Sequence, residues 1–136
     1  MSVIVTDTGF AADTWTQGFR TAGPDAANTS GAGIDLPSDT PATALAALLA
    51  APMIRIDFPS FADGRGFTLA TALRRAGYAG RLRARGHVIA DQYAMARRCG
   101  FDEIEISDDL AARQPEPQWL ARADWQNHNY QARMRG

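Results

Sequence analysis

Apolar and polar positions alternate in two rhythms along the middle of the chain. Runs rich in branched apolar residues predict strands at 34–36, 53–58, 81–85 and 101–106. Between them, apolar residues spaced three and four apart predict helices at 41–50, 67–76 and 88–99. Strands that alternate with helices of about ten residues are typical of right-handed parallel βαβ units. We therefore expect an α/β fold with a mostly parallel sheet.

The pattern leaves open how the sheet is completed. An open Rossmann-like sheet and a curved, half-barrel-like one both fit consecutive βα units. In either architecture the carboxyl ends of the strands meet at one rim, where a ligand would bind. At the first of the helices, Asp39 is the expected N-cap and Pro41 is expected in the first turn.

Both ends of the chain lack this alternation of strand and helix patterns. We nevertheless expect the whole chain, 1–136, to form a single domain. Residues 1–32 contain an apolar run at 3–5, predicted to be a strand, and a loop-like segment at 21–33. Residues 33–107 are the α/β core. Residues 108–136 form a tail that is polar and broken by proline as far as Pro117, and then carries an apolar stripe at helical spacing: Trp119, Ala123, Tyr130 and Met134.

The tail contains two of the three tryptophans, Trp119 and Trp125. The interpretation we favour is that they pack back on the sheet. The alternative is that they anchor a partner or a second copy of the chain, which would make a homo-oligomer through the tail, because aromatic residues dominate binding hot spots.

Composition narrows the class of protein. A chain of 136 residues, 46% hydrophobic, can bury one core. A net charge of −1 and a pI near 6.1 argue against nucleic-acid binding, which needs a basic field. All 14 basic residues are arginines, and the single cysteine, Cys99, rules out an intrachain disulfide. No stretch has transmembrane length, and the N-terminus lacks signal-peptide features, so we expect a cytoplasmic protein and no membrane partner.

The most informative segment, 56–68, runs from a strand through a charged turn into a helix. Gly64-Arg65-Gly66 opens like a dinucleotide-binding motif, but Leu69 stands where the third glycine would be. The free N–H groups of the helix start could hold an anion. The competing interpretation is a βα loop whose glycines only relieve backbone strain. We expect no bound cofactor.

Polar residues near the strand ends form the candidate anion-binding set: Asp57, Asp63, Arg65, Arg83, Asp91 and Gln92, with Arg85 and His87 as weaker candidates. Arginine forks and helix amides would suit sulfite, sulfate or phosphate. Alternatively, these residues form structural ion pairs, with Asp57 or Asp63 on Arg65. His87 could donate a proton, although a lone histidine is more often structural. With two histidines and one cysteine, we expect no dedicated metal site.

Several stretches together resemble a bacterial family of unknown function: 57–70 with its Asp-Gly-Arg-Gly turn, 73–84, Asp91-Gln92 and 98–102. Members of that family are commonly labelled as oxidoreductases involved in sulfite reduction. The resemblance covers about residues 40–107, and the six stronger candidates match its pattern. The chain departs from it at Arg85 and His87, and the tail matches little.

The resemblance implies a place in a pathway more than a reaction, through the family's association with the sulfite reductase hemoprotein. We therefore expect an accessory protein of assimilatory sulfite reduction and cysteine biosynthesis that docks on that hemoprotein or supports it. Since the sequence shows no flavin, haem or iron–sulfur motif, an electron-transfer role would need a borrowed cofactor. The alternative is a small enzyme or binding module for an anionic metabolite, with an aspartate as base and Arg65 as clamp.

Overall fold

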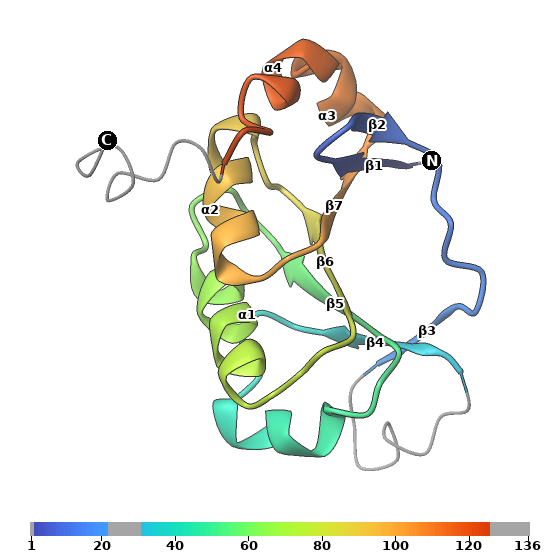
Figure 1. Cartoon of the computed structure of the whole chain (residues 1–136), viewed down its shortest axis with the longest axis vertical. Helices are drawn as coiled ribbons and strands as arrows, with labels where there is room; N and C mark the ends of the chain where they lie inside the picture. Colours follow the sequence, from blue (N-terminus) through green and yellow to red (C-terminus); the bar gives the residue numbers. More distant parts are fainter. Residues whose placement is uncertain (1, 22–30, 126–136) are drawn as a thin grey trace.

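The computed structural model describes residues 2–21 and 31–125 (Figure 1). Within these ranges seven strands form one sheet, in the order β2-β1-β7-β6-β5-β4-β3. The strands are β1 (Ser2–Thr6), β2 (Gly9–Ala11), β3 (Phe19–Thr21), β4 (Gly33–Leu36), β5 (Met53–Phe58), β6 (Arg81–Gly86) and β7 (Glu103–Ser107). Neighbours from β3 to β7 are parallel, whereas β1 is antiparallel to both β7 and β2. The α/β prediction is confirmed, and the sheet is open because β2 and β3 are free edges.

The helices are η2 (Ala42–Leu48), α1 (Arg65–Arg75), η3 (Ala90–Gln92), α2 (Tyr93–Cys99), α3 (Asp108–Arg113) and α4 (Glu116–Leu120). The first four lie between successive parallel strands, whereas α3 and α4 follow β7, the last strand. Because β3 to β7 follow one another in sequence order, right-handed crossovers place their helices on the same face of the sheet. Figure 1 shows η2, α1 and α2 stacked along that face.

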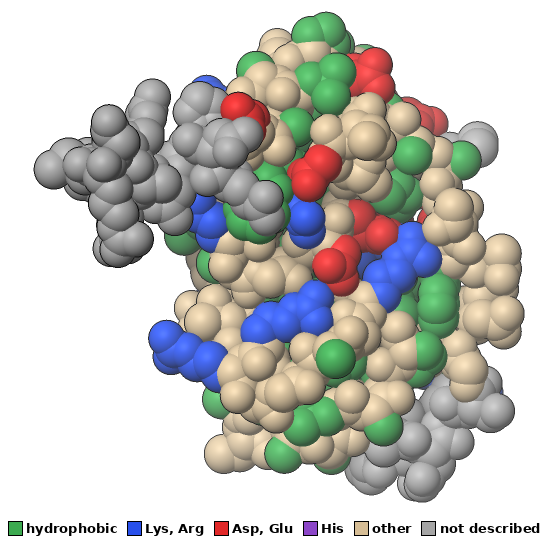
Figure 2. All heavy atoms as spheres, in the orientation of Figure 1, with side chains coloured by type: hydrophobic (Ala, Val, Ile, Leu, Met, Phe, Trp, Pro, Cys, Tyr) green, Lys and Arg blue, Asp and Glu red, His purple; other side chains and the backbone are tan. Residues whose placement is uncertain are grey.

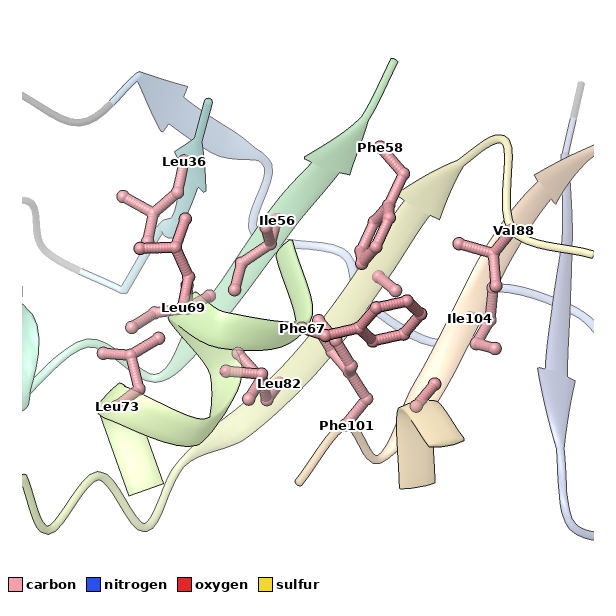
Figure 3. Packing of buried hydrophobic residues seen from close by; sticks show 14 of the residues in the cluster. Leu36, Ile56, Phe58, Phe67, Leu69, Leu73, Leu82, Val88, Phe101 and Ile104 are labelled. Carbon is pink, nitrogen blue, oxygen red and sulfur yellow. The ribbon is translucent and has the colours of Figure 1, made fainter. Parts of the chain in front are cut away.

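The hydrophobic core lies between this helical layer and the sheet. Ile54, Ile56 and Phe58 of β5 are at most 1% exposed. They alternate with Arg55 and Asp57, which point to the other face, as the period of two in a strand requires. Figure 3 shows the apolar side chains of the central strands meeting those of α1, with the Phe58 and Phe67 rings 5.0 Å apart.

Local structure differs from expectation in the helices. The segment predicted as an α-helix at 41–50 is a 3-10 helix, and no side chain caps its start. Asp39 is therefore not the N-cap that we expected. The neighbouring Thr40 stabilises the preceding turn, because its Oγ1 donates to the Pro37 carbonyl at 2.7 Å. The single helix expected at 88–99 is divided into η3 and α2.

Two short strands and one helix escape the sequence pattern. The strands β2 and β3 have only three residues each, too few for an alternating pattern to be visible. The helix α3 occupies a stretch that we expected to be irregular. Its start is stabilised by Ser107, whose Oγ accepts from the Leu110 N–H at 3.1 Å, and by two aspartates in the first turn.

The described part of the tail, up to residue 125, packs back on the fold, and Trp119 joins the hydrophobic core as the favoured interpretation predicted. That side chain is 1% exposed, lies edge-on to Tyr93 and donates its Nε1–H to the Gln114 carbonyl. Glu116 accepts from the Phe10 N–H at 2.8 Å and so joins α4 to β2. Trp125 is partly buried beside Arg97. Tyr130 and Met134, part of the predicted stripe, lie outside the described residues.

Candidate functional site

The turn between β5 and α1 carries an exposed aromatic side chain on a fixed backbone. We call residues 59–64 the Phe61 loop. Its carbonyl at Phe61 accepts from the Gln92 amide at 2.7 Å, and the Ala62 N–H donates to the Ser60 Oγ at 3.2 Å. The Ser38 hydroxyl reaches in from the β4 side and donates to Asp63 at 3.2 Å. The loop is thus held from two sides, by Gln92 and Ser38, while Phe61 itself is 61% exposed.

Asp63 and Arg65 face each other across this turn. Arg65 donates from Nε to Asp63 Oδ1 at 3.0 Å and from Nη2 to Oδ2 at 2.7 Å, and its backbone N–H adds a third bond at 3.1 Å. These hydrogen bonds hold the pKa of the Asp63 carboxyl well below its ordinary value of 3.8. An anion at Arg65 would therefore have to displace a paired carboxylate.

The two glycines around Arg65 have different surroundings. Gly64 precedes α1 with φ −85°, a value open to any residue, and nothing lies near the position of a Cβ there. A Cβ at Gly66 would clash with the Phe58 ring, so a side chain at this position would push α1 away from β5. Close packing of helix on strand therefore explains Gly66 without a phosphate ligand.

Asp91, Gln92 and His87 lie near the carboxyl end of β6 but face different neighbours. Gln92 links two loops, because its Oε1 also accepts from the Ile89 N–H at 3.0 Å. Asp91 turns to the tail and pairs with Arg122 at 2.8 Å. His87 is exposed, with Nδ1 at 3.3 Å from the Phe58 carbonyl. The predicted set is thus distributed over the rim rather than gathered around one point.

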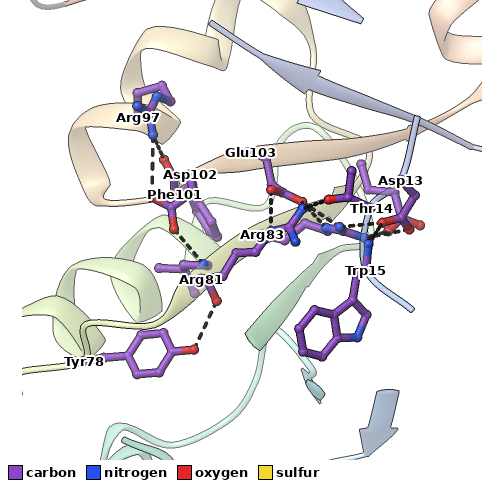
Figure 4. Close-up of polar contacts among 12 residues, drawn as sticks. Asp13, Thr14, Trp15, Tyr78, Arg81, Arg83, Arg97, Phe101, Asp102 and Glu103 are labelled. Carbon is purple, nitrogen blue, oxygen red and sulfur yellow. Dashed lines mark hydrogen bonds and ion pairs between the residues drawn. The ribbon is translucent and has the colours of Figure 1, made fainter. Parts of the chain in front are cut away.

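Arg83 is not at the rim, contrary to our expectation. It lies in the middle of β6, is fully buried, and points to the face of the sheet without helices. Nε donates to Glu103 at 2.6 Å and Nη2 to Asp13 at 2.8 Å (Figure 4). Nη1 donates to Glu105 at 2.8 Å. Burial acts to lower the pKa of Arg83, but these carboxylates outweigh it and raise the pKa further above its ordinary value.

This face carries a network of opposite charges in place of a second helical layer. We call it the charged sheet face; it comprises Asp35, Arg55, Arg83, Glu103 and Glu105. Arg55 binds Asp35 through two bonds of 2.6 and 2.9 Å and Glu105 through one of 3.0 Å. The Phe19 ring covers its guanidinium at 3.7 Å. Figure 2 shows acidic and basic side chains interleaved on the surface in view, with no field of one sign.

Sequence reasoning missed most of this network, although a signal was present. In the strands 53–58, 81–85 and 103–107 the charged residues occupy alternate positions: both signs occur on the first strand, only arginines on the second and only glutamates on the third. Neighbouring parallel strands in register would place those charges side by side on one face. Asp13 has no such signal, because it lies 70 residues from Arg83 in the chain.

Asp57 and Arg85 lie at the rim end of the same face and line a pocket of about 250 Å³. They are register partners on β5 and β6, and their closest charged atoms are 3.8 Å apart. Their side chains are 45% and 44% exposed, so this ion pair is longer and more exposed to solvent than the other ion pairs of the charged sheet face. Asp57 thus lies opposite Arg85, and it is Asp63 that pairs with Arg65.

Two further observations concern ligands and membranes. Among the residues that the structure describes, no group of three or more His, Cys, Asp or Glu side chains is placed to hold a metal ion. Cys99, at the end of α2, is partly buried. In the same ranges, no helix has the length and apolar character needed to cross a membrane.

The geometry defines a small α/β protein with one open sheet, helices on one face and an ion-pair network on the other. The chain belongs to a family of bacterial proteins of unknown function (DUF934), whose sequence model matches residues 33–136. The match begins at β4 and therefore leaves out β1 to β3 and Asp13. No curated protein and no solved structure matches the chain significantly.

Proposed function

We propose that this protein is an accessory factor of assimilatory sulfite reduction that docks on the sulfite reductase hemoprotein. The proposal starts from the resemblance described in the sequence analysis, which implies an association with that hemoprotein; the matching family model itself describes only bacterial proteins of unknown function. The structural observation that supports it best is the Phe61 loop, where a large aromatic side chain projects from a well-anchored backbone.

The Phe61 loop has the properties of a docking element. Burying a phenylalanine that is exposed in the free protein contributes about 1.5–3 kcal/mol to association. Binding also costs conformational entropy wherever a loop must become ordered, and the bonds from Gln92 and Ser38 reduce that cost in advance. The Asp63–Arg65 pair beside the ring supplies polar groups of the kind found at the rim of interfaces.

In this proposal the chain binds and positions, and the partner's cofactors carry the electrons. The hemoprotein would supply the redox groups for any electron-transfer step. The role left to the chain is to stabilise the hemoprotein, or to favour the productive encounter with its electron donor. Loss of the chain should therefore lower sulfite reductase turnover in cells without changing the spectrum of the purified hemoprotein.

A direct binding measurement tests this proposal. The cognate hemoprotein is immobilised, and wild-type chain is compared with Phe61→Ser and with Met95→Ser, a matched control on α2 that is 51% exposed. We expect saturable binding that Phe61→Ser weakens by about tenfold or more, or at least 1.4 kcal/mol, while Met95→Ser has no effect. Absence of binding by the wild-type chain would contradict the proposal. An equal loss in both variants would remove the Phe61 loop from it.

A further inference from the structure

The pocket at the rim end of the charged sheet face has a charge pattern that selects a class of ligand. Its lining residues are Thr21, Asp35, Leu36, Pro37, Arg55, Asp57 and Arg85. Two carboxylates and two guanidinium groups give the lining a net charge of zero at neutral pH. A simple oxyanion would gain from the arginines but would also face both carboxylates. The pocket thus suits a ligand that carries one charge of each sign.

The four charged residues form two pairs: one whose hydrogen-bonding groups are already occupied within the protein, and one whose groups can still bind a ligand. Arg55 and Asp35 are joined by two short bonds, and Arg55 also holds Glu105. These groups are committed to the sheet and form the floor of the pocket. Asp57 and Arg85, in contrast, approach only to 3.8 Å and share no hydrogen bond of ordinary length. Each therefore retains capacity to bind an external group.

The size of the pocket restricts the ligand further. A volume of about 250 Å³ lies below the range of about 300–1,000 Å³ that is usual for drug-sized ligands. A molecule of a few heavy atoms would fit, with Leu36 and Pro37 offering apolar contact to a small side chain.

We propose that this pocket binds a small α-amino acid as a zwitterion, with its carboxylate on Arg85 and its ammonium group on Asp57. The ligand would insert between two side chains that are now loosely paired, and each would exchange one weak ion pair for a charge-assisted hydrogen bond. The carboxylate and ammonium groups of an α-amino acid are both attached to Cα and so lie close together, as do two side chains that are register partners on neighbouring strands. The proposal uses neither the Phe61 loop nor the hemoprotein, and stands apart from the proposed function.

Probes that lack one charge at a time test the proposal on the full chain. L-serine, L-cysteine and L-valine are titrated up to about 10 mM, a range that detects millimolar dissociation constants. The readouts are the amide signals of Asp57 and Arg85 and the Nε–H signal of Arg85 in nitrogen-correlated NMR spectra. N-acetyl-L-serine lacks the ammonium group, L-serinamide lacks the carboxylate, and sulfate is a plain oxyanion.

We expect at least one of the three amino acids to saturate these signals, and both blocked serine derivatives to bind about tenfold more weakly or worse. Arg85→Gln and Asp57→Asn should each abolish the shifts. Arg113→Gln, the same change at an exposed arginine on α3, should leave them intact. Since Asp57 and Arg85 are nearly half exposed, both variants should fold, which circular dichroism checks.

Three results would overturn the proposal. One is the absence of saturable shifts with all three amino acids. Another is binding of sulfate, or of either blocked derivative, as tight as that of the amino acids, which would show that one charge suffices. The third is unchanged binding in Arg85→Gln, which would place the ligand elsewhere.

Discussion

Replacing Arg83 by methionine should cost the fold about 3 kcal/mol of unfolding free energy. Methionine keeps an unbranched chain of similar length, so the change removes charge and hydrogen bonds more than volume. Arg83 is fully buried and donates four hydrogen bonds to three carboxylates. Removing one partner of a buried ion pair typically costs 3–5 kcal/mol, because the remaining charge stays desolvated.

The remaining contacts of the three carboxylates place the cost at the lower end of that range. Glu103 keeps two bonds from Arg81, and Glu105 keeps its bond from Arg55. Asp13 loses the arginine that holds it, but its side chain is 34% exposed and can be solvated. We therefore expect a loss of about 3 rather than 5 kcal/mol.

Urea unfolding followed by circular dichroism measures this loss. With a slope of about 1.5 kcal/mol/M, the midpoint should fall by about 2 M. The control is Arg85→Met, two residues along the same strand and face, whose side chain is 44% exposed; its effect should stay within about 0.5 kcal/mol. A midpoint for Arg83→Met within experimental error of the wild type, or above it, would refute the view that this network stabilises the sheet.

Three other outcomes follow from the same structure. Hydrogen bonds from Arg83 hold the pKa of Asp13 below 3.8. The unfolded state therefore binds more protons in acid, and the free energy of unfolding should fall below about pH 4. Urea midpoints measured at several pH values should show that acid lowers the free energy of unfolding less in Arg83→Met than in the wild type. Trp119→Ala should lower the free energy of unfolding by about 3–5 kcal/mol in the same assay. Leu120→Ala, at the next position and 42% exposed, should lower it by less than about 1 kcal/mol. Equal losses in the two variants would contradict the view that Trp119 anchors the tail. The purified protein should be colourless, and flavin mononucleotide fluorescence should show no saturable quenching at micromolar concentration, because the glycine motif is incomplete; quenching that Arg65→Ala abolishes would contradict this.

The sequence predicted the α/β class and the mostly parallel sheet because strand and helix patterns alternate along the core. Ile54 and Ile56 flank Arg55, and that period of two fixes which face meets the helices. The sequence could not predict which type of helix forms at 42–48, or strands that are too short to show a period. The segment 42–48 contains good helix formers but is a 3-10 helix, and the strand β3 has too few residues to show a period.

The candidate site was predicted only in part. The sequence indicated polar residues near the strand ends, and Asp63 does meet Arg65 there. Arg83 was grouped with the rim residues although it lies in the middle of the strand predicted at 81–85, and the structure places it on the sheet face without helices. The contact of Arg83 with Asp13 depends on the path of the chain across the sheet, which no local pattern reports.

Growth of a deletion strain tests the proposed function most directly. A strain that lacks this chain and has no redundant homologue is supplied with sulfate, or with sulfide or cysteine, and is complemented with wild type, Phe61→Ser or Met95→Ser. Our account predicts failure on sulfate alone, normal growth on sulfide and cysteine, and rescue by wild type and Met95→Ser but not by Phe61→Ser. Normal growth of the deletion strain on sulfate would contradict the role in sulfite reduction.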